Sequence, residues 1–254
     1  MTILTALQTD ASIEGEKDVL GGFQILESDV YDLEIELAYY TTANSGAIAL
    51  NLQAKTSGGA TVRQQLYVTS GTEKGLKNYY ERNGEKHYLP GFLTANSLVQ
   101  LTLGREIGTV EPEEKVINLY NYDAKAEIPT KVSMITELIG QKIKAGILKQ
   151  VVDKNQKNDA GEYVPTGETR EQNEIDKFFC AREGYEGMTT TEVADPNVTE
   201  AVFITRWLDK WKGQVQNKAK GLSGAQAGIP QAGGATANAG QAPAAPAPGK
   251  SLFA

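Results

Sequence analysis

Apolar and polar residues alternate through the first half of the chain, and this alternation predicts short β-strands. The apolar positions are Tyr31, Leu33, Ile35 and Leu37 in a first run, Ile48, Leu50 and Leu52 in a second, and Val62, Leu66 and Val68 in a third. Residues typical of turns, including Asn44, Gly46, Gly58 and Gly59, separate the runs. We therefore predict strands at about 30–40, 47–53 and 60–69, joined as a meander that forms a small barrel or sandwich.

The second half of the chain returns to the same period. A strand is predicted at 116–122, and alternation resumes near residue 131 with a break at Gly140. We interpret 132–149 as two strands paired in a hairpin through that glycine. Lys142, Lys144 and Lys149 follow its second arm, and Lys142 and Lys144 point the same way because they are two residues apart. Residues 155–169 are polar, as in a hairpin tip.

Two segments have helical spacing instead. Phe92, Leu93, Leu98 and Leu101 predict a short helix that ends near Gly104 and caps one end of the barrel. Phe203, Trp207 and Trp211 predict a C-terminal helix packed on the barrel.

The chain divides into three parts by composition. Residues 1–22 mix apolar and acidic residues and predict an irregular acidic arm, and residues 23–218 hold the strands and helices of one domain. Residues 219–254 are rich in Ala, Gly and Pro, which predicts a disordered tail, and its hydrophobic tip, Leu252 and Phe253, predicts a peptide held out for a partner protein. No apolar run is long enough to span a bilayer, and the N-terminus has no basic, secretory-type start, so we expect a cytoplasmic protein.

Charge is distributed unevenly along the chain. The formal net charge is −7, which alone argues against a polyanionic ligand. Residues 1–36 and 159–200 are acidic, however, whereas 131–157 and 206–220 are basic. Because a polyanion responds to the local field, such segregation is compatible with a basic groove on an acidic protein. The alternative, charge scattered over solvated faces, stays open.

The sequence lacks the signatures of most enzyme classes. Cys180 is the only cysteine and His87 the only histidine, which excludes disulfides and a Cys/His zinc site within the chain. Cys180 follows two phenylalanines and is expected to be a small buried hydrophobe. No phosphate loop, dinucleotide fingerprint, nucleophile elbow or zinc-protease motif is present. We therefore expect no enzymatic activity, no metal and no cofactor.

Tyrosines are concentrated on the predicted β framework. Nine of the 11 tyrosines lie between Tyr31 and Tyr122, and the long connection from Lys74 to Tyr88 interleaves them with basic residues. Single-stranded nucleic acid exposes both bases and phosphates, so a binder needs rings for stacking and cations along the backbone path. Tyr31 is assigned to the core. The candidate nucleic-acid-binding residues are Tyr39, Tyr40, Arg63, Tyr67, Lys77, Tyr79, Tyr80, Arg82, Lys86, Tyr88, Lys142, Lys144 and Lys149.

This combination resembles the single-stranded DNA-binding proteins encoded by bacteriophages. The resemblance rests on the strand Tyr31-Asp32-Leu33-Glu34-Ile35-Glu36-Leu37, the strand Leu66-Tyr67-Val68-Thr69 with the following Lys77-Asn78-Tyr79-Tyr80, the 132–149 hairpin and the terminal Ser251-Leu252-Phe253-Ala254. It implies an OB-fold-like five-stranded barrel with additional hairpins and a flexible C-terminal tail. Tails of that family are usually acidic up to a final aromatic residue, whereas this tail carries Lys250 and ends in Ala254. Electrostatic competition between tail and DNA is therefore not expected, but recruitment of partners through Leu252 and Phe253 is.

The function expected on this basis is non-enzymatic, sequence-tolerant binding of single-stranded DNA. The protein would protect exposed strands during phage DNA replication or recombination in the cytoplasm of an infected bacterium, and its tail would recruit phage or host replication and recombination proteins. Affinity should fall strongly with added salt. One alternative is a structural or assembly protein of a virion that uses the tyrosine-rich surface as an interface. A further alternative is a hydrolase with carboxylates and a metal, such as a nuclease.

Overall fold

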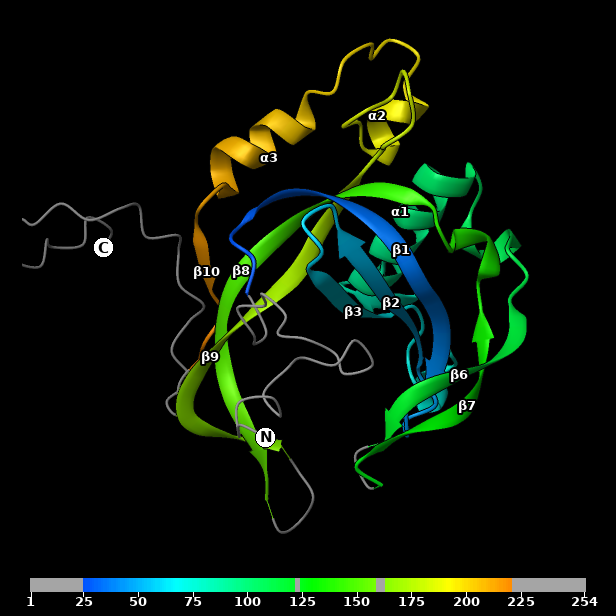
Figure 1. Cartoon of the computed structure of the whole chain (residues 1–254), viewed down its shortest axis with the longest axis vertical. Coiled ribbons are helices and arrows are strands. Elements are labelled where there is room, and N and C mark those ends of the chain that lie inside the picture. Colours follow the sequence, from blue (N-terminus) through cyan, green and yellow to red (C-terminus); the bar gives the residue numbers. More distant parts are fainter. Residues whose placement is uncertain (1–24, 122–123, 159–162, 221–254) are drawn as a thin grey trace, which may run out of the picture.

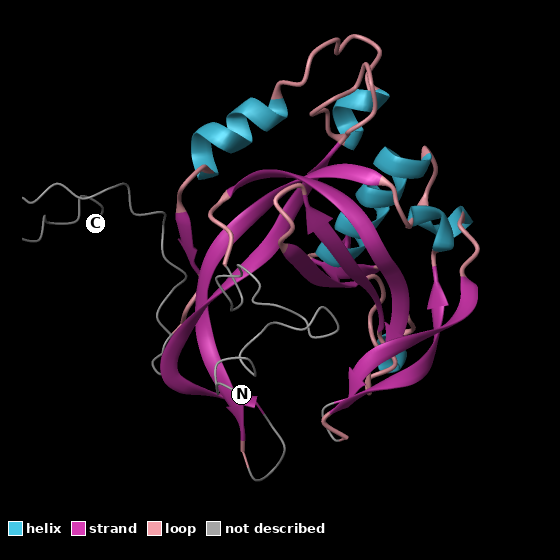
Figure 2. Cartoon of the chain, in the orientation of Figure 1, coloured by secondary structure: helices cyan, strands magenta, loops and turns pink. Residues whose placement is uncertain are grey.

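The computed structural model describes residues 25–121, 124–158 and 163–220, and within these the protein is mainly β (Figures 1 and 2). The strands are β1 (Asp29–Thr42), β2 (Ile48–Thr56), β3 (Thr61–Tyr67), β4 (Tyr79–Arg82), β5 (Glu85–Tyr88), β6 (Glu113–Asn121), β7 (Ala126–Met134), β8 (Lys142–Lys157), β9 (Tyr163–Phe179) and β10 (Val215–Asn217). The α-helices are α1 (Pro90–Leu103), α2 (Thr190–Ala194) and α3 (Phe203–Trp211). The predicted meander strands are confirmed as β1, β2 and β3, and the two predicted helices as α1 and α3. Helix α2 was not predicted.

Strand β1 organises the main sheet. On one edge, residues 33–42 pair with β2 in antiparallel register, from Leu33 opposite Thr56 to Thr42 opposite Ile48. On the other edge, its first residues pair with β8 and its last with β7. A register shift between Ile35 and Leu37 marks an irregularity where these pairings change over. The remaining pairings place β3 beside β2, β6 beside β7, β9 beside β8, and the short β10 parallel to β8.

The predicted hairpin over residues 132–149 is wrong. Strands β7 and β8 do not pair with each other; each pairs with a different part of β1. Gly140 does turn the chain, with φ +77°, but the connection packs along β1, where Gly140 N donates to Ile35 O and Ile135 N to Ala38 O, both at 2.8 Å. The alternating pattern located β8 and the last residues of β7, but Thr136–Leu138, which it predicted as strand, form a short 3-10 helix. The pattern also carries no information about which neighbour each strand takes. The hairpin that β8 forms is with β9.

The predicted OB-fold-like five-stranded barrel is not closed in the described part of the chain. In the described part of the chain, strands β3 and β9 each have a free edge, and no backbone ladder joins them. One side chain bridges the two strands instead, since Ile175 N donates to Gln64 Oε1 at 3.1 Å. We call this junction the seam. The strongly curved β1 and the long β8–β9 pair wrap round the core (Figure 1).

Helix α1 covers the core where β3 ends. It begins with Pro90 at a position where a missing N–H costs nothing, and ends at Gly104 with φ +73°. Its buried residues are Ala95, Leu98, Val99 and Leu101. Gly91 is required at its start, because an added Cβ would collide with the backbone of Tyr67. The close approach fixes the end of β3, and with it Tyr67, against the helix.

Helix α3 packs Trp207 into a second hydrophobic cluster. Trp207 is buried with Leu148 and Phe179, and its Nε1 donates to Asp176 Oδ2 at 2.7 Å. The ring lies on Gly146, where a Cβ would come within 2.8 Å of ring carbons. Cys180 is fully buried, as predicted. In the chain from residue 25 to 220, apart from its two short gaps, no helix has the length and apolar character needed to cross a membrane.

Candidate nucleic-acid interface

The outward side of β1, β2 and β3 forms a polar and aromatic surface, which we call the outer face. Alternation along β1 buries Ala38 and turns Tyr39 outward. The cross-strand pairs Tyr39–Asn51, Asn51–Gln65, Gln53–Arg63 and Ala49–Tyr67 set the lateral neighbours. The outer face therefore comprises Tyr39, Thr41, Asn51, Gln53, Arg63, Gln65 and Tyr67. It brings together three of the predicted binding residues, Tyr39, Arg63 and Tyr67.

Two rows of side-chain amides hold this face in place. In the first, Gln53 Nε2 donates to Glu36 Oε2 at 3.0 Å and Gln53 Oε1 accepts from Arg63 Nε at 2.8 Å. The bond from Gln53, with Lys55 3.5 Å away, lowers the pKa of the Glu36 carboxyl, although burial opposes the shift. Gln53 accepts from the Nε–H of Arg63, and within residues 25–121, 124–158 and 163–220 the two terminal amino groups of the guanidinium have no hydrogen-bond partner.

The second row lies two residues further along the strands, at the next pair that points to the outer face. Gln65 Nε2 donates to Asn51 Oδ1 at 3.1 Å, and Asn51 Nδ2 donates to Thr41 Oγ1 at 2.7 Å. Burial raises the pKa of the nearby Tyr39 phenol, partly offset by the charge of Arg63. The sequence pattern marked these amides only as polar positions; their link to Tyr39 and Arg63 depends on the strand register.

Beyond the outer face, Tyr67 opens onto a cavity of about 950 Å³. Its lining includes Lys77, Tyr79 and Tyr80 from the connection after β3 and Asn44 from the β1–β2 turn. Backbone bonds fix this connection, because Ser70 N donates to Lys77 O and Leu89 N to Asn78 O, both at 2.8 Å. Tyr67, which belongs to β3, therefore lines the same cavity as Tyr79 and Tyr80.

The predicted long loop contains a two-stranded hairpin, β4–β5, which we call the tyrosine hairpin. Tyr79 lies opposite Tyr88, and Tyr80 opposite His87 with ring centroids 5.5 Å apart. Tyr80 and Tyr88 are 44% and 56% exposed, and the Tyr88 ring lies 5.2 Å from that of Phe92. These contacts support one side of each ring and leave surface for another planar group.

Two lysine ammonium groups lie over the ring of Tyr79. The ammonium groups of Lys77 and Lys86 lie 5.4 and 4.9 Å from its centroid, within the range of a cation–π contact. Neither lysine forms an ion pair within the described residues, and Arg82 likewise has none there. Acids are close in the register, however, with Glu81 opposite Lys86 and Glu85 opposite Arg82. The tyrosine hairpin thus combines exposed rings with nearly balanced charge.

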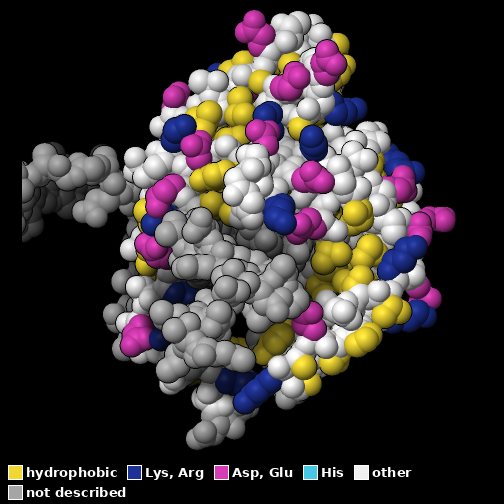
Figure 3. Space-filling view, viewed as in Figure 1, with side chains coloured by type: hydrophobic (Ala, Val, Ile, Leu, Met, Phe, Trp, Pro, Cys, Tyr) yellow, Lys and Arg dark blue, Asp and Glu magenta, His cyan; other side chains and the backbone are white. Residues whose placement is uncertain are grey.

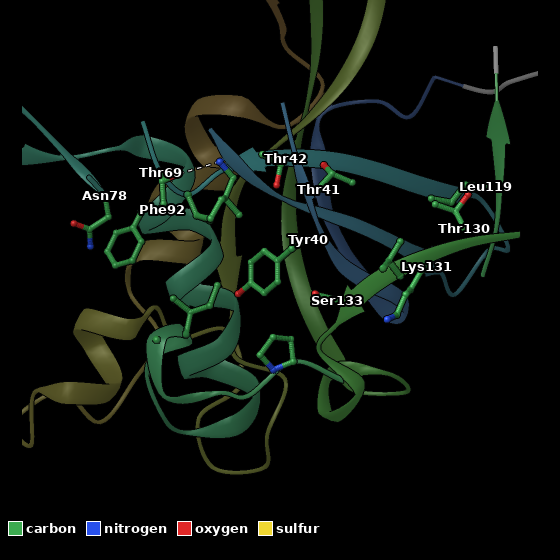
Figure 4. A pocket seen from close by; sticks show the side chains of 16 residues that line it. Tyr40, Thr41, Thr42, Thr69, Asn78, Phe92, Leu119, Thr130, Lys131 and Ser133 are labelled. Carbon is green, nitrogen blue, oxygen red and sulfur yellow. Dashed lines mark hydrogen bonds between the residues drawn. The ribbon is translucent and has the colours of Figure 1, made fainter. Parts of the chain in front are cut away.

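Tyr40 does not join this surface. It packs inward against the core, and burial raises the pKa of its phenol to about 12. Its ring points into an apolar cavity of about 750 Å³ between the end of β1, helix α1 and the β6–β7 hairpin, with Phe92 and Thr130 among the lining residues (Figure 4).

The three lysines of β8 that were predicted to bind nucleic acid lie among acids, away from the tyrosine hairpin. Lys144 forms an ion pair with Asp32, and Lys149 lies 2.9 Å from Glu27 and 3.4 Å from Glu171. The bond to Glu27 is the main reason that the pKa of Lys149 is raised. Lys142 has no ion pair in the described chain, but it shares a cavity with Asp32, Glu34, Glu36 and Glu186. Figure 3 displays the same mixture of acidic and basic side chains over one face.

Sequence reasoning missed Arg170 on β9. It lines a small cavity together with Arg63 at the seam. Its polar surroundings on a hairpin arm gave no signal in the sequence. The proposed partner-binding residues Leu252 and Phe253, and the arm over residues 1–22, lie outside the described residues. Within the described part, no group of three or more His, Cys, Asp or Glu side chains is placed to hold a metal.

Comparison of the sequence with protein-family models and with curated proteins gives no match.

Proposed function

We propose that the protein binds single-stranded DNA without strong sequence preference, along a path that runs over the outer face and onto the tyrosine hairpin. The observation that carries this proposal is the shared cavity of Tyr67, Tyr79 and Tyr80, with Lys77 at its wall. Rings that stack on bases and cations that meet phosphates are the two requirements for such a ligand.

The order of the strands supports the proposal. The chain has a three-strand meander, a helix after the third strand, and then β8, which returns antiparallel to β1, and β9, which pairs with β8. This order is compatible with that of an OB-fold in which β8 and β9 are the last two strands. OB-folds are partly open barrels that bind oligonucleotides on the face of their second and third strands. We therefore propose an OB-fold variant that is open at the seam, with β4–β5 and β6–β7 as insertions. Its binding face coincides with the outer face.

The rings supply most of the proposed affinity. Stacking contributes about 1 to 3 kcal/mol per base and tolerates any base, because every base has a π-face. Tyr67 is 46% exposed, similar to Tyr80. Three or four such rings on one path account for binding that depends little on sequence.

Charge contributes less than the sequence alone suggested. Of the predicted cations, Arg63, Lys77, Arg82 and Lys86 lie on the path without an ion pair in the described chain, whereas Lys144 and Lys149 are paired with acids. Each phosphate neutralised on a single strand adds about 0.7 to the slope of log K against log salt. With three or four contacts we expect a slope of roughly −2 to −3.

Titration of a fluorescent oligo-dT by the full chain at two salt concentrations tests the proposal. Binding at low salt that weakens at higher salt supports it. No binding at low salt would contradict it. Stable binding without loss of the oligonucleotide in the presence of Mg²⁺ would further distinguish it from the nuclease alternative.

The biological setting is part of the same proposal. A sequence-tolerant binder would protect strands exposed during phage DNA replication or recombination in the cytoplasm of an infected bacterium, without enzymatic activity. The peptide around Leu252 and Phe253 would recruit replication or recombination proteins. A pull-down of host and phage lysate with the full chain and with a Leu252→Ser/Phe253→Ser variant tests that recruitment separately from DNA binding.

One observation favours the second candidate, a virion structural or assembly protein. The β6–β7 hairpin exposes apolar side chains on both of its strands, including Val116 at 67% and Ile128 at 37%, and hydrophobic side chains gather in this region in Figure 3. Such exposure is typical of protein–protein contacts. Large closed assemblies of the purified protein that ignore DNA would favour this candidate.

A further inference from the structure

The seam between β3 and β9 contains a second, smaller cavity of about 320 Å³. It is lined by Thr61, Val62 and Arg63 of β3, by Arg170, Glu171, Gln172 and Asn173 of β9, and by Ile25. Both strands present unpaired edges here in the described chain. Two arginines from segments more than 100 residues apart in the sequence therefore converge on one small space.

The acids near these two arginines are engaged with other groups, although the charge of Arg63 contributes to the lowered pKa of Glu36. Neither arginine forms an ion pair with an acid of the described chain. Glu171 lines the cavity, but it lies 3.4 Å from Lys149 Nζ, so its charge is shared with that lysine. Glu36 lies near Arg63 but is bonded to Gln53 and paired with Lys55. Two arginines that share one cavity with a single carboxylate, itself paired with Lys149, favour an anionic ligand between them.

The side chains of Asn173, which lines the cavity, and of Arg63 are held in place by hydrogen bonds. Asn173 bonds the backbone of Leu26 in both directions, accepting from its N at 2.8 Å and donating to its O at 2.7 Å. Gln53 holds Arg63 by Nε, and the terminal amino groups of Arg63 have no hydrogen-bond partner among the described residues. A planar guanidinium fixed in this way can donate two parallel hydrogen bonds to an oxyanion, as arginines do with phosphate.

The cavity is continuous with the outer face, because Arg63 belongs to both. A strand that follows β2 and β3 would reach the seam at Arg63 and meet Arg170 on the opposite side.

We propose that Arg63 and Arg170 form a phosphodiester clamp at the seam, through which the bound single strand passes from the outer face onto the β8–β9 arm. The clamp rests on the proposed function and adds a residue and a direction to it: the strand leaves the outer face across the seam.

The salt dependence of oligo-dT binding tests the clamp with the full-length protein. Wild type is compared with Arg170→Gln and with Arg182→Gln, a matched control whose guanidinium lies over the Tyr185 ring without an ion pair in the described chain. Arg170→Gln is expected to weaken binding about threefold to tenfold at low salt and to reduce the magnitude of the slope by about 0.7. Arg182→Gln should leave both unchanged.

A double variant separates the clamp from general electrostatics. If the two arginines hold one phosphate, Arg170→Gln should cost much less in an Arg63→Gln background than in wild type. Wild-type binding with an unchanged slope in folded Arg170→Gln, or equal losses in both backgrounds, would overturn the clamp and leave the proposed function standing. No binding of oligo-dT by the wild-type protein would overturn both the clamp and the proposed function. Displacement of oligo-dT by inorganic phosphate beyond that by chloride at equal ionic strength, lost in Arg170→Gln, would assign the site to free phosphate instead.

Discussion

Arg63 Nε donates a 2.8 Å hydrogen bond to Gln53 Oε1, directly across the β2–β3 pairing. The same amide donates to Glu36, so one uncharged side chain stands between the carboxylate and the guanidinium. Glu36 is thereby engaged without forming an ion pair with Arg63. Gln53 thus orients the guanidinium of Arg63 on the outer face. Within the described chain the terminal amino groups of Arg63 remain available to a ligand.

The first prediction concerns this amide. Gln53→Ala should weaken oligo-dT binding by about 0.5 to 1.5 kcal/mol, the usual contribution of one hydrogen bond, because Arg63 loses its orientation. In an Arg63→Gln background the same change should have almost no further effect on affinity. Fluorescence anisotropy on the four proteins of this cycle measures the coupling. Additive losses would mean that Gln53 does not act through Arg63.

The second prediction concerns stacking. Tyr80→Ala should reduce affinity for oligo-dT by about 1 to 3 kcal/mol without changing the midpoint of thermal unfolding, because the ring is exposed and supported on one side only. Tyr185 is exposed to nearly the same extent, 45%, but lies in a loop after β9. Tyr185→Ala is therefore the control, and an equal loss of affinity in both variants would remove the tyrosine hairpin from the proposed path.

The third prediction concerns pH. The hydrogen bond from Gln53 lowers the pKa of Glu36 below its ordinary value of 4.5. A carboxyl with a lowered folded-state pKa stabilises the fold above its unfolded-state pKa, and this contribution is lost as pH falls through the folded-state value. Between pH 6 and pH 3 the free energy of unfolding of wild type should therefore fall more steeply than that of Glu36→Gln. Urea unfolding at several pH values measures this difference, and parallel curves would contradict it.

The fourth prediction concerns the packing of α3. Gly146→Ala places a Cβ against the Trp207 ring and should destabilise the protein by about 1 to 3 kcal/mol, the usual cost of overpacking. Gly108→Ala is the control, because a Cβ there meets nothing within 4 Å. Urea unfolding compares the two. Oligo-dT binding by folded Gly146→Ala should remain that of wild type, since α3 contributes nothing to the proposed path.

Local pattern determined most of the elements but not their partners. Alternation located β1, β2, β3, β6, β8 and the end of β7, and helical spacing located α1 and α3, because burial of one face leaves a period in the sequence. The pairing of β7 and β8 could not be predicted in this way. Both strands are amphipathic and joined by a glycine turn, which is compatible with a hairpin, and only the docking of Ile135 and Gly140 on β1 decides otherwise.

The candidate site was predictable to a similar extent. Tyrosines interleaved with lysines and arginines pointed to the stretch from Lys74 to Tyr88. In the structure this stretch contains the tyrosine hairpin. Whether a lysine is balanced by an acid depends on contacts between distant segments, such as that of Lys149 with Glu27. For the same reason Arg170 gave no signal, since its proximity to Arg63 arises only at the seam.

The most direct test of the central claim is a comparison of affinities for three oligonucleotides of equal length at one low salt concentration. These are oligo-dT, a mixed-sequence single strand and the corresponding duplex. Stacking on exposed tyrosines requires unpaired bases, so the two single strands should bind with similar affinity and the duplex much more weakly. Equal or tighter binding of the duplex, or no binding of any of the three, would contradict the account.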